Sequence, residues 1–408
     1  TFGGKVGKSK YRILILGAGA GGISLAARLA RKVSPNDIAI VDPAENHFYQ
    51  PMWTLVGAGL AAKEATRKKQ STLIPAGVTW LRESVKSVDP IARKVNLSHD
   101  LVVEYDYLVV ATGLRLAWEK IEGLEGNLGK NGICSIYEYD QVDYTASQIQ
   151  GFQGGAAVFV MPPVPIKCAG APQKIMYLAE NIFRLNGVRH KSQVVFATAG
   201  KAMFGIPTFS NALEKLVREK EIEPKYLHKI VGVDANKKEA YFDVTDADGK
   251  VIRQSLKFDL LHVVPPMAAH QYVADSGLAF ESGDQKGWLE VDKHTLQHLK
   301  YSNIFGIGDV TGVPNSKTGA AIRSQYPIVA ENLLAVMEGR APSASYNGYS
   351  SCPLVTEIGK VMLAEFGYDE KLMPTFPLDP AVPRRTMWHL KKDVLPHLYW
   401  QGMLRGWA

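Results

Sequence analysis

The feature that most constrains the fold of this chain is a glycine-rich turn set between two apolar runs near its start. The first run covers residues 13–16, the turn reads Gly-Ala-Gly-Ala-Gly-Gly over residues 17–22, and the second run, residues 38–41, ends in Asp42. An alanine-rich segment of helical character lies between the turn and the second run. A strand, such a turn, a helix and a strand ending in an acid form a unit that binds dinucleotides, the acid accepting hydrogen bonds from a ribose. The stretch therefore predicts an α/β fold with a dinucleotide site.

The residues of the turn have separate predicted roles. Gly17 is expected to allow the tight turn, Gly19 to let the backbone approach a pyrophosphate, and Gly22 to let the helix pack closely on the first strand. Ala20 and Gly21 lie at the start of the helix, where free N–H groups and the positive end of the dipole face the phosphates. The alternative interpretation is a plain packing turn of a strand–helix–strand unit.

Composition excludes several classes of protein. The chain has 408 residues, 46% of them hydrophobic and 21% charged, which is enough for two or three folded domains. No run approaches the roughly 20 apolar residues of a membrane span. The net charge is +7, but the basic residues are scattered and no basic helix is interleaved with aromatics, so nucleic-acid binding is not expected. The chain opens with Thr1 rather than Met, so an upstream segment is expected to have been cleaved or omitted, and a targeting peptide is one candidate for it.

Further positions in the first domain are candidates for cofactor contact. Gln50 lies in a polar and aromatic loop, residues 45–51, whose alternative interpretation is a packed connector. Val85 belongs to residues 78–88, which alternate like a strand, and its backbone is expected beside an adenine. Gly113 closes a small-residue turn after a buried strand, where the chain passes the cofactor and leaves for a second domain.

The second domain is expected to repeat the strand–loop–helix layout without its dinucleotide turn. A strand over residues 156–161 runs into a loop, residues 162–172, that contains prolines and Cys168, and a helix begins near Gln173. Another strand follows at residues 193–198. Proline lacks an N–H donor and fixes φ, so this loop cannot form a pyrophosphate cradle. We therefore predict a Rossmann-like domain that has lost the nicotinamide dinucleotide.

The chain is then expected to return to the first domain. Residues 301–309 form a short strand ending in Gly-Asp, and Asp309 is placed to bind a ribityl hydroxyl of a flavin. The helix start that follows can face the flavin ring. Lys317 lies within reach of that site, the alternative being a solvated surface lysine.

The tail, residues 388–408, is more apolar and aromatic than an exposed segment should be, and basic residues flank its aromatic ones. This combination is typical of a membrane interface. The alternative is a C-terminal helix packed on the body or in a homodimer contact. The predicted division of the chain is residues 10–114 and 295–350 for the first domain, 115–294 for the second, and 351–408 for a membrane-associating C-terminal region.

The cysteines Cys134, Cys168 and Cys352 are too few for a disulfide scaffold, so any pair among them is expected to be catalytic. Cys134 lies outside the notable motifs and is expected to be an ordinary buried residue. Cys168 and Cys352 are far apart in the sequence, and only the fold could bring them together beside a flavin. No metal site is predicted.

The order of these motifs resembles the disulfide reductase superfamily of flavoproteins, in which the first domain holds FAD and in which Asp42 and Asp309 match ribose and ribityl ligands. The chain also closely resembles the mitochondrial-type sulfide:quinone oxidoreductase family, in the segments HFYQPMWTLVGAG, KCAGAPQKIMYLAE, NIFGIGD, PNSKT and YSSCPLV. The resemblance extends over residues 11–407. It implies an α/β fold of two Rossmann-like dinucleotide-binding domains with a C-terminal membrane-associating segment.

The resemblance also implies a reaction. Cys168 and Cys352 would be bridged in the oxidised enzyme, directly or through an extra sulfur, and hydrogen sulfide would attack the bridge. The persulfide would lie on Cys352, and a small acceptor such as sulfite or glutathione would remove its sulfur. Electrons would pass through FAD to ubiquinone at the mitochondrial inner membrane, to which the protein would bind peripherally.

Lysines near these motifs have expected roles. Lys317 and Lys391 match family positions near the flavin and quinone and are assigned to cofactor binding. Lys167 is next to Cys168 and either lowers a thiolate pKa or, the favoured interpretation, points to water. The nearest rival function is an NADH:quinone dehydrogenase, which needs the second glycine-rich loop that the prolines replace. The rival of a different class is a FAD-containing structural or signalling protein with little turnover, which would not require Cys168 and Cys352 together.

Overall fold

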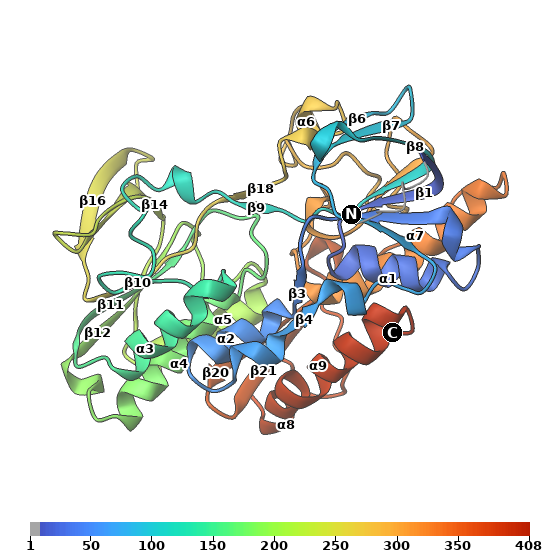
Figure 1. The fold of residues 1–408 in the computed structure, drawn as a ribbon. Helices are drawn as coiled ribbons and strands as arrows, with labels where there is room; N and C mark the ends of the chain where they lie inside the picture. The colour runs from blue at the N-terminus through green and yellow to red at the C-terminus, as the bar shows by residue number, and fades with distance from the viewer. Residues whose placement is uncertain (1–8) are drawn as a thin grey trace, which may run out of the picture.

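The computed structural model describes residues 9–408 as two α/β lobes that lie side by side (Figure 1). The first lobe is built on a seven-stranded sheet of order β5-β2-β1-β8-β7-β6, with β19 also paired to β8. Its strands are β1 (Lys10–Leu16), β2 (Ile38–Val41), β5 (Thr79–Leu81), β6 (Val85–Asp89), β7 (Lys94–Leu97), β8 (Val102–Val110) and β19 (Ile304–Gly306). The pairs among β5, β2, β1, β8 and β19 are parallel, whereas β6 and β7 join antiparallel.

The central strands of this sheet are buried on both faces, which explains their continuous apolar runs. Helix α1 (Ala20–Leu29) connects β1 to β2 and packs beside α7 (Gly319–Met337) (Figure 1). Because β19 and α7 come from the return of the chain, the first lobe is completed only by residues far along the sequence.

The second lobe contains a parallel sheet of order β10-β17-β11-β12-β13 and a separate antiparallel sheet β14-β15-β16. The parallel strands are β10 (Ile133–Cys134), β11 (Gly155–Met161), β12 (Ser192–Thr198), β13 (Glu223–Lys225) and β17 (Leu260–His262). The antiparallel strands are β14 (His228–Asp234), β15 (Glu239–Thr245) and β16 (Val251–Lys257). The helices are α3 (Val142–Gln150), α4 (Ala171–Leu185) and α5 (Pro207–Glu219). The strands predicted at 156–161 and 193–198 correspond to β11 and β12, and the helix predicted near Gln173 is α4.

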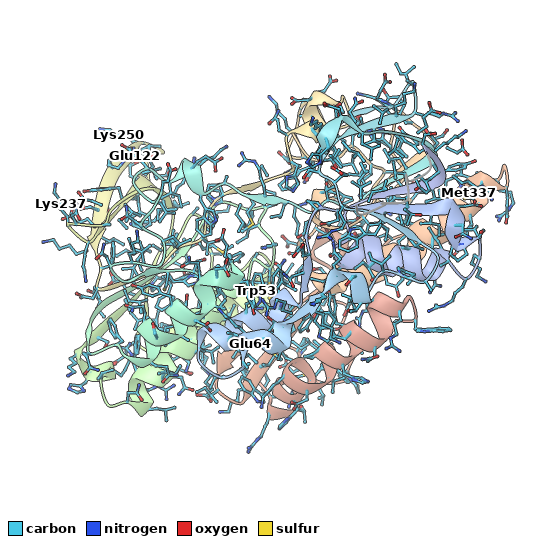
Figure 2. All side chains as sticks on the ribbon, viewed as in Figure 1. Trp53, Glu64, Glu122, Lys237, Lys250 and Met337 are labelled. Atoms are coloured by element: carbon cyan, nitrogen blue, oxygen red, sulfur yellow. The ribbon has the colours of Figure 1, made fainter. Side chains whose placement is uncertain are left out.

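Short elements connect the lobes. Strands β9 (Arg115–Leu116) and β18 (Met267–Ala268) pair antiparallel in the link, and α2 (Trp53–Gly57) reaches from the first lobe to α3 and α4. Figure 2 shows Trp53 between the lobes, and Lys237 and Lys250 at the far end of the second. The remaining named elements are β3 (Asn46–Phe48), β4 (Arg67–Lys69), α6 (Tyr272–Asp275), the hairpin β20 (Ser350–Glu357) and β21 (Lys360–Phe366), α8 (Arg385–His389) and α9 (Leu395–His397).

The strand expected over residues 78–88 is two strands. β5 and β6 lie at opposite edges of the sheet, and residues 82–84 form a polar break between them. The backbone turns there because the N–H of Glu83 bonds back to the carbonyl of Leu81. Alternation of apolar residues predicted the strand character but could not show this break.

The tail packs on the body of the protein: Trp388 at its start is buried in the core shared by the second lobe and the hairpin β20–β21, and its later residues pack on the first lobe. The hydrophobic core of the first lobe buries Tyr399, Trp400, Met403 and Leu404, whereas Trp407 remains 70% exposed. Packing on the body therefore accounts for most of the apolar character of the tail. Among residues 9–408, no helix is both long enough and apolar enough to cross a bilayer.

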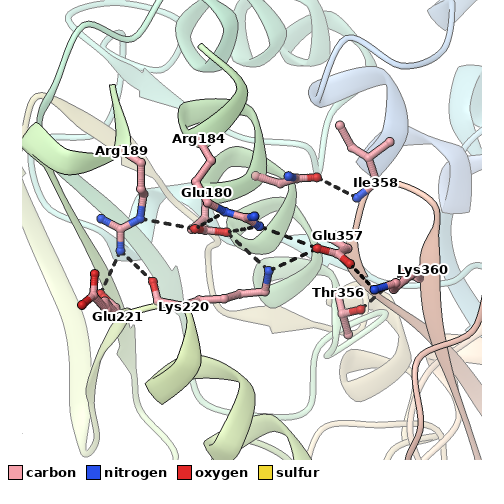
Figure 3. A network of polar contacts seen from close by, with 10 residues as sticks. Glu180, Arg184, Arg189, Lys220, Glu221, Thr356, Glu357, Ile358 and Lys360 are labelled. Atoms are coloured by element: carbon pink, nitrogen blue, oxygen red, sulfur yellow. Dashed lines mark hydrogen bonds and ion pairs between the residues drawn. The ribbon is translucent and has the colours of Figure 1, made fainter. Parts of the chain in front are cut away.

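A buried ionic network ties the second lobe to the hairpin β20–β21 (Figure 3). The Glu180 side chain on α4 is 1% exposed and pairs with Arg184 at 2.8 Å, Arg189 at 3.4 Å and Lys220 at 3.5 Å. Glu357, at the end of β20, joins through Arg184 at 3.7 Å and Lys220 at 3.8 Å. The network therefore fixes the end of β20 against α4.

Replacement of Glu180 by glutamine is expected to lower the free energy of unfolding by about 3 kcal/mol, because it leaves Lys220 and Arg189, whose side chains are 9% and 16% exposed, without their carboxylate. Urea unfolding followed by tryptophan fluorescence measures this. The matched control is Glu338→Gln, which removes a pair with Arg340 that is 61% exposed on both sides and should change little. Equal, small effects of the two variants would show that the buried network contributes no stability.

Candidate functional site

The glycine-rich turn has the geometry of a dinucleotide cradle. Gly17 has φ +102°, and a Cβ there would lie 2.2 Å from the carbonyl oxygen of Ala111. A Cβ at Gly22 would lie 1.9 Å from the carbonyl oxygen of Gly17, so the helix approaches the strand as predicted. At Gly19 a Cβ would meet no atom within 4 Å, which leaves the backbone open to a ligand at the N-terminus of α1, where Ala20 begins the helix.

The two predicted acids, Asp42 and Asp309, have carboxylate oxygens free to accept hydrogen bonds from ligand hydroxyls. The Asp42 carboxylate accepts from the backbone N–H groups of Ala18 at 2.7 Å and Ala44 at 2.8 Å, which fixes its orientation and leaves lone pairs on both oxygens. Asp309 is half-buried, and no hydrogen bond between residues of the described chain engages its carboxylate. Burial raises the pKa of Asp309, while the charges of Lys317 and Lys167 oppose that rise. The residues present therefore fit a dinucleotide with a hydroxyl-bearing extension.

The fold brings Cys168 and Cys352 into contact as free thiols. Cys168 lies in the loop between β11 and α4 with φ 49°, and its N–H donates to the carbonyl of Lys317 at 2.8 Å. Cys352 lies on β20 and is 2% exposed. A Cβ at Gly170 would lie 2.3 Å from the Cys352 sulfur, so only glycine admits β20 so close to the Cys168 loop.

Two buried lysines lie near the Cys168–Cys352 pair. Lys174, on α4, is 1% exposed and its Nζ donates to the Cys168 sulfur at 3.2 Å. Lys391 is 4% exposed, and its Nζ donates to the carbonyl of Pro51 at 3.1 Å. A hydrogen bond from the Cys352 thiol, together with the charges of Lys174 and Lys391, holds the pKa of Cys168 well below its usual range. The same hydrogen bond and burial raise the pKa of Cys352.

Burial and neighbouring charges also shift the pKa values of the two lysines. Burial lowers the pKa of Lys391 to about 7, helped by the nearby charge of Lys174. The pKa of Lys174 is instead raised, because the two thiols outweigh its burial. The pair of sulfurs is therefore arranged to carry one negative charge, on Cys168, next to a permanent cation.

Lys317 is buried rather than solvated. It is 5% exposed, its Nζ donates to the carbonyl of Thr311 at 2.9 Å, and it lies 4.0 Å from the centroid of the Trp288 ring. Burial lowers its pKa to about 8, against the charge of Asp309. The alternative of a solvated surface lysine is therefore wrong. The backbone carbonyl of Lys317 also accepts from the N–H of Cys168, so this residue supports the Cys168 loop as well.

Lys167 is half-buried and bonds an exposed amide rather than a thiol. Its Nζ donates to the side-chain oxygen of Gln50 at 2.7 Å, and burial lowers its pKa. Gln50 is thus engaged by a lysine, at the seam between the lobes. This bond lies at the exposed side of the seam, so the expectation that Lys167 points toward water stays a prediction.

Two other predicted cofactor positions, Val85 and Gly113, and the third cysteine, Cys134, have different surroundings. Val85 is half-buried at the start of β6, and Gly113 has φ +65° with open space around its Cα. Cys134 lies on β10 beside His262, fully buried, and burial raises its pKa to about 12. Cys134 is therefore an inert core residue, as predicted.

Sequence reasoning missed Lys174 and Tyr137. The Tyr137 hydroxyl donates to the carbonyls of Lys167 at 3.1 Å and Cys168 at 3.2 Å, which supports the Cys168 loop. A signal for Lys174 was present, since it begins an apolar helical run, and a lysine in a buried helix requires an anionic partner.

Known proteins resemble this chain along most of its length. Residues 11–160 match the family described as pyridine nucleotide-disulphide oxidoreductase. The chain is 43% identical over 402 residues to the mitochondrial sulfide:quinone oxidoreductase of Mus musculus, covering 98% of this chain and 88% of that protein. It is 40% identical over 401 residues to the protein of the same name from Dictyostelium discoideum, covering 98% and 87%. The fold matches the sulfide:quinone oxidoreductase of Aquifex aeolicus with a TM-score of 0.78 at 20% identity, over 97% of this chain and 92% of that one.

Proposed function

This chain belongs to the mitochondrial sulfide:quinone oxidoreductase family, and from that premise we propose that Cys168 and Cys352 are the redox pair through which it oxidises hydrogen sulfide. The observation that carries the proposal is the contact of the two thiols beside the buried ammonium of Lys174. A sulfide oxidation requires a bridge that can be attacked and a sulfur that can leave as an anion. The arrangement places two thiols close enough to be bridged, with an ammonium group beside the sulfur that would leave.

The proposed reaction begins with the two sulfurs bridged. Hydrosulfide attacks Cys352, a new S–S bond forms there, and the bond to Cys168 breaks with its electron pair remaining on Cys168. Cys352 then carries a persulfide and Cys168 is a thiolate, stabilised by Lys174. Because Cys168 can leave as a stabilised thiolate, hydrosulfide is expected to attack the sulfur of Cys352. The lowered pKa of Cys168 supports this assignment.

The persulfide is then discharged to a small acceptor. With sulfite, the sulfane sulfur leaves as thiosulfate, the proton of the persulfide is released, and Cys352 is left as a thiolate; glutathione is the other acceptor that we propose. Lys391, whose pKa is about 7, is placed to take up or release a proton beside the pair at neutral pH.

The cofactor that we propose is FAD. The turn with Gly17, Gly19, Ala20, Gly21 and Gly22 would hold its pyrophosphate, and Asp42, Asp309 and Lys317 would contact its hydroxyls and ring, with Gln50, Val85, Gly113 and Lys391 nearby. When bound, FAD supplies a two-electron acceptor for the two thiolates, whose bridge re-forms, and passes those electrons to ubiquinone.

A quinone acceptor makes a membrane surface the expected location, and we propose peripheral association with the mitochondrial inner membrane. Support comes from exposed apolar side chains in the C-terminal region, where Phe376, Leu378 and Val382, which are 38%, 47% and 42% exposed, line one small apolar hollow. Val394 is 52% exposed on the tail.

Anaerobic addition of sulfide to the purified yellow protein is expected to bleach its flavin absorbance, and a short-chain ubiquinone should then restore it. NADH in a parallel cuvette is expected to leave the spectrum unchanged, because the proline loop offers no pyrophosphate cradle. Bleaching by NADH and not by sulfide would replace this proposal with the dehydrogenase function.

A further inference from the structure

Residues 405–407 pack against the C-terminal end of α1, the helix that follows the dinucleotide turn. The Arg31 guanidinium, just after α1, donates to the backbone carbonyls of Arg405 and of Gly406, the latter at 3.0 Å, and lies 3.5 Å from the centroid of the Trp407 ring. Gly406 has φ +71°, and a Cβ there would lie 2.6 Å from the backbone nitrogen of Arg28. The contact is therefore a close backbone approach with no room for a side chain, and not a loose covering.

A buried polar chain runs from this segment to the turn itself. The Tyr399 hydroxyl bonds the Nε2 of His47, and the Nδ1 of His47 lies 3.1 Å from the carbonyl oxygen of Ala18. Tyr399 is 8% exposed and His47 is 4% exposed. Because a carbonyl only accepts, Nδ1 carries the proton and Nε2 accepts from the tyrosine. Burial lowers the pKa of His47 to about 4, which keeps the imidazole neutral in this arrangement.

Ala18 lies inside the turn, between Gly17 and Gly19, and both of its backbone polar groups are held. Its N–H donates to the Asp42 carboxylate at 2.7 Å, and its carbonyl accepts from His47. A glycine-rich turn has many accessible backbone conformations, so fixing the one that admits a ligand removes an entropic cost of binding. The buried polar groups of Tyr399 and His47 satisfy each other, which makes the chain of bonds costly to interrupt.

We infer that residues 398–408, called here the clasp, position the dinucleotide turn, and that Tyr399 acts on cofactor retention through His47 and the carbonyl of Ala18. The inference rests on the proposed function for the identity of the cofactor as FAD. It makes the last residues of the chain part of the binding apparatus of its first domain, although neither Tyr399 nor His47 is placed in contact with the cofactor.

The experiment measures FAD release from the diluted holoenzyme by the rise in free flavin fluorescence. Tyr399→Phe is expected to raise the FAD dissociation constant about tenfold, the order expected from leaving one buried nitrogen unpaired. The matched control is Tyr368→Phe, since Tyr368 is 9% exposed in the same core and its hydroxyl donates to the carbonyl of Lys293 at 2.6 Å. The control should retain FAD as the wild type does, although both variants lose one buried hydroxyl.

A double-mutant cycle with His47→Leu tests the route. Once His47 is gone, adding Tyr399→Phe is expected to change the dissociation constant less than about twofold, because the two residues act in series. A full additional tenfold loss would overturn the route through His47, and wild-type FAD retention by Tyr399→Phe would overturn the clasp. If those results came with intact sulfide bleaching, the proposed function would stand; a wild-type protein that binds no FAD would overturn both.

Discussion

Replacement of Cys168 by serine is expected to reduce sulfide-dependent flavin bleaching by about 10³-fold or more, the scale seen when a covalent participant is removed. Serine cannot form the sulfur bridge that hydrosulfide attacks, and its alkoxide is too basic to leave in the place of a thiolate. Stopped-flow absorbance under anaerobic conditions measures the rate. Cys352→Ser is expected to give a similar loss, since one sulfur alone cannot form the bridge.

Cys134→Ser serves as the control for the cysteine variants. Cys134 is fully buried on β10 and lies outside the pair, so its replacement should leave the bleaching rate close to that of the wild type. Retention of the yellow flavin spectrum by each variant shows that the fold and cofactor survive. A Cys168→Ser protein that bleaches at the wild-type rate would refute the cysteine mechanism.

Replacement of Lys174 by methionine is expected to shift the pH dependence of the reaction toward alkaline pH. Lys174 stabilises the thiolate of Cys168, so removing its charge raises the pKa of that group and lowers the thiolate fraction at a given pH. An opposite charge at this range shifts a pKa by about 1–3 units, so the rate on the acidic side should fall about tenfold or more. The loss should diminish as the pH rises.

The measurement is the pH profile of the bleaching rate, together with the rate at which iodoacetamide alkylates Cys168 in the reduced protein. Lys174→Arg keeps the charge and should keep the profile near that of the wild type. Lys286→Met removes an exposed lysine and should not move the profile. An unshifted profile in Lys174→Met would mean that the ammonium does not set the reactivity of Cys168.

The sequence alone carried the parts of this protein that are local. The turn of Gly17, Gly19 and Gly22 could be interpreted without a structure because each glycine answers a backbone constraint within the same strand–helix unit. The same holds for the strands β11 and β12, whose apolar runs lie within a few residues, and for the proline loop, whose missing N–H groups are visible in the residue types.

Other features depended on packing between distant segments. Lys174 and Lys317 are buried cations. The residue type alone does not show whether a lysine side chain is solvated or buried, because the elements packed around it decide this. The polar break that sends β5 and β6 to opposite edges of the sheet likewise depends on which neighbours each strand finds.

The sequence by itself determined the type of each domain, the dinucleotide turn and the identity of the two reactive cysteines as candidates. The tertiary structure decided that Cys168 and Cys352 touch, that Lys174 is the cation beside them, and that the tail lies on α1. The physical reason is that a turn is set by the conformations its own residues permit, whereas a contact between β20 and the loop before α4 is set by the packing of every element between them.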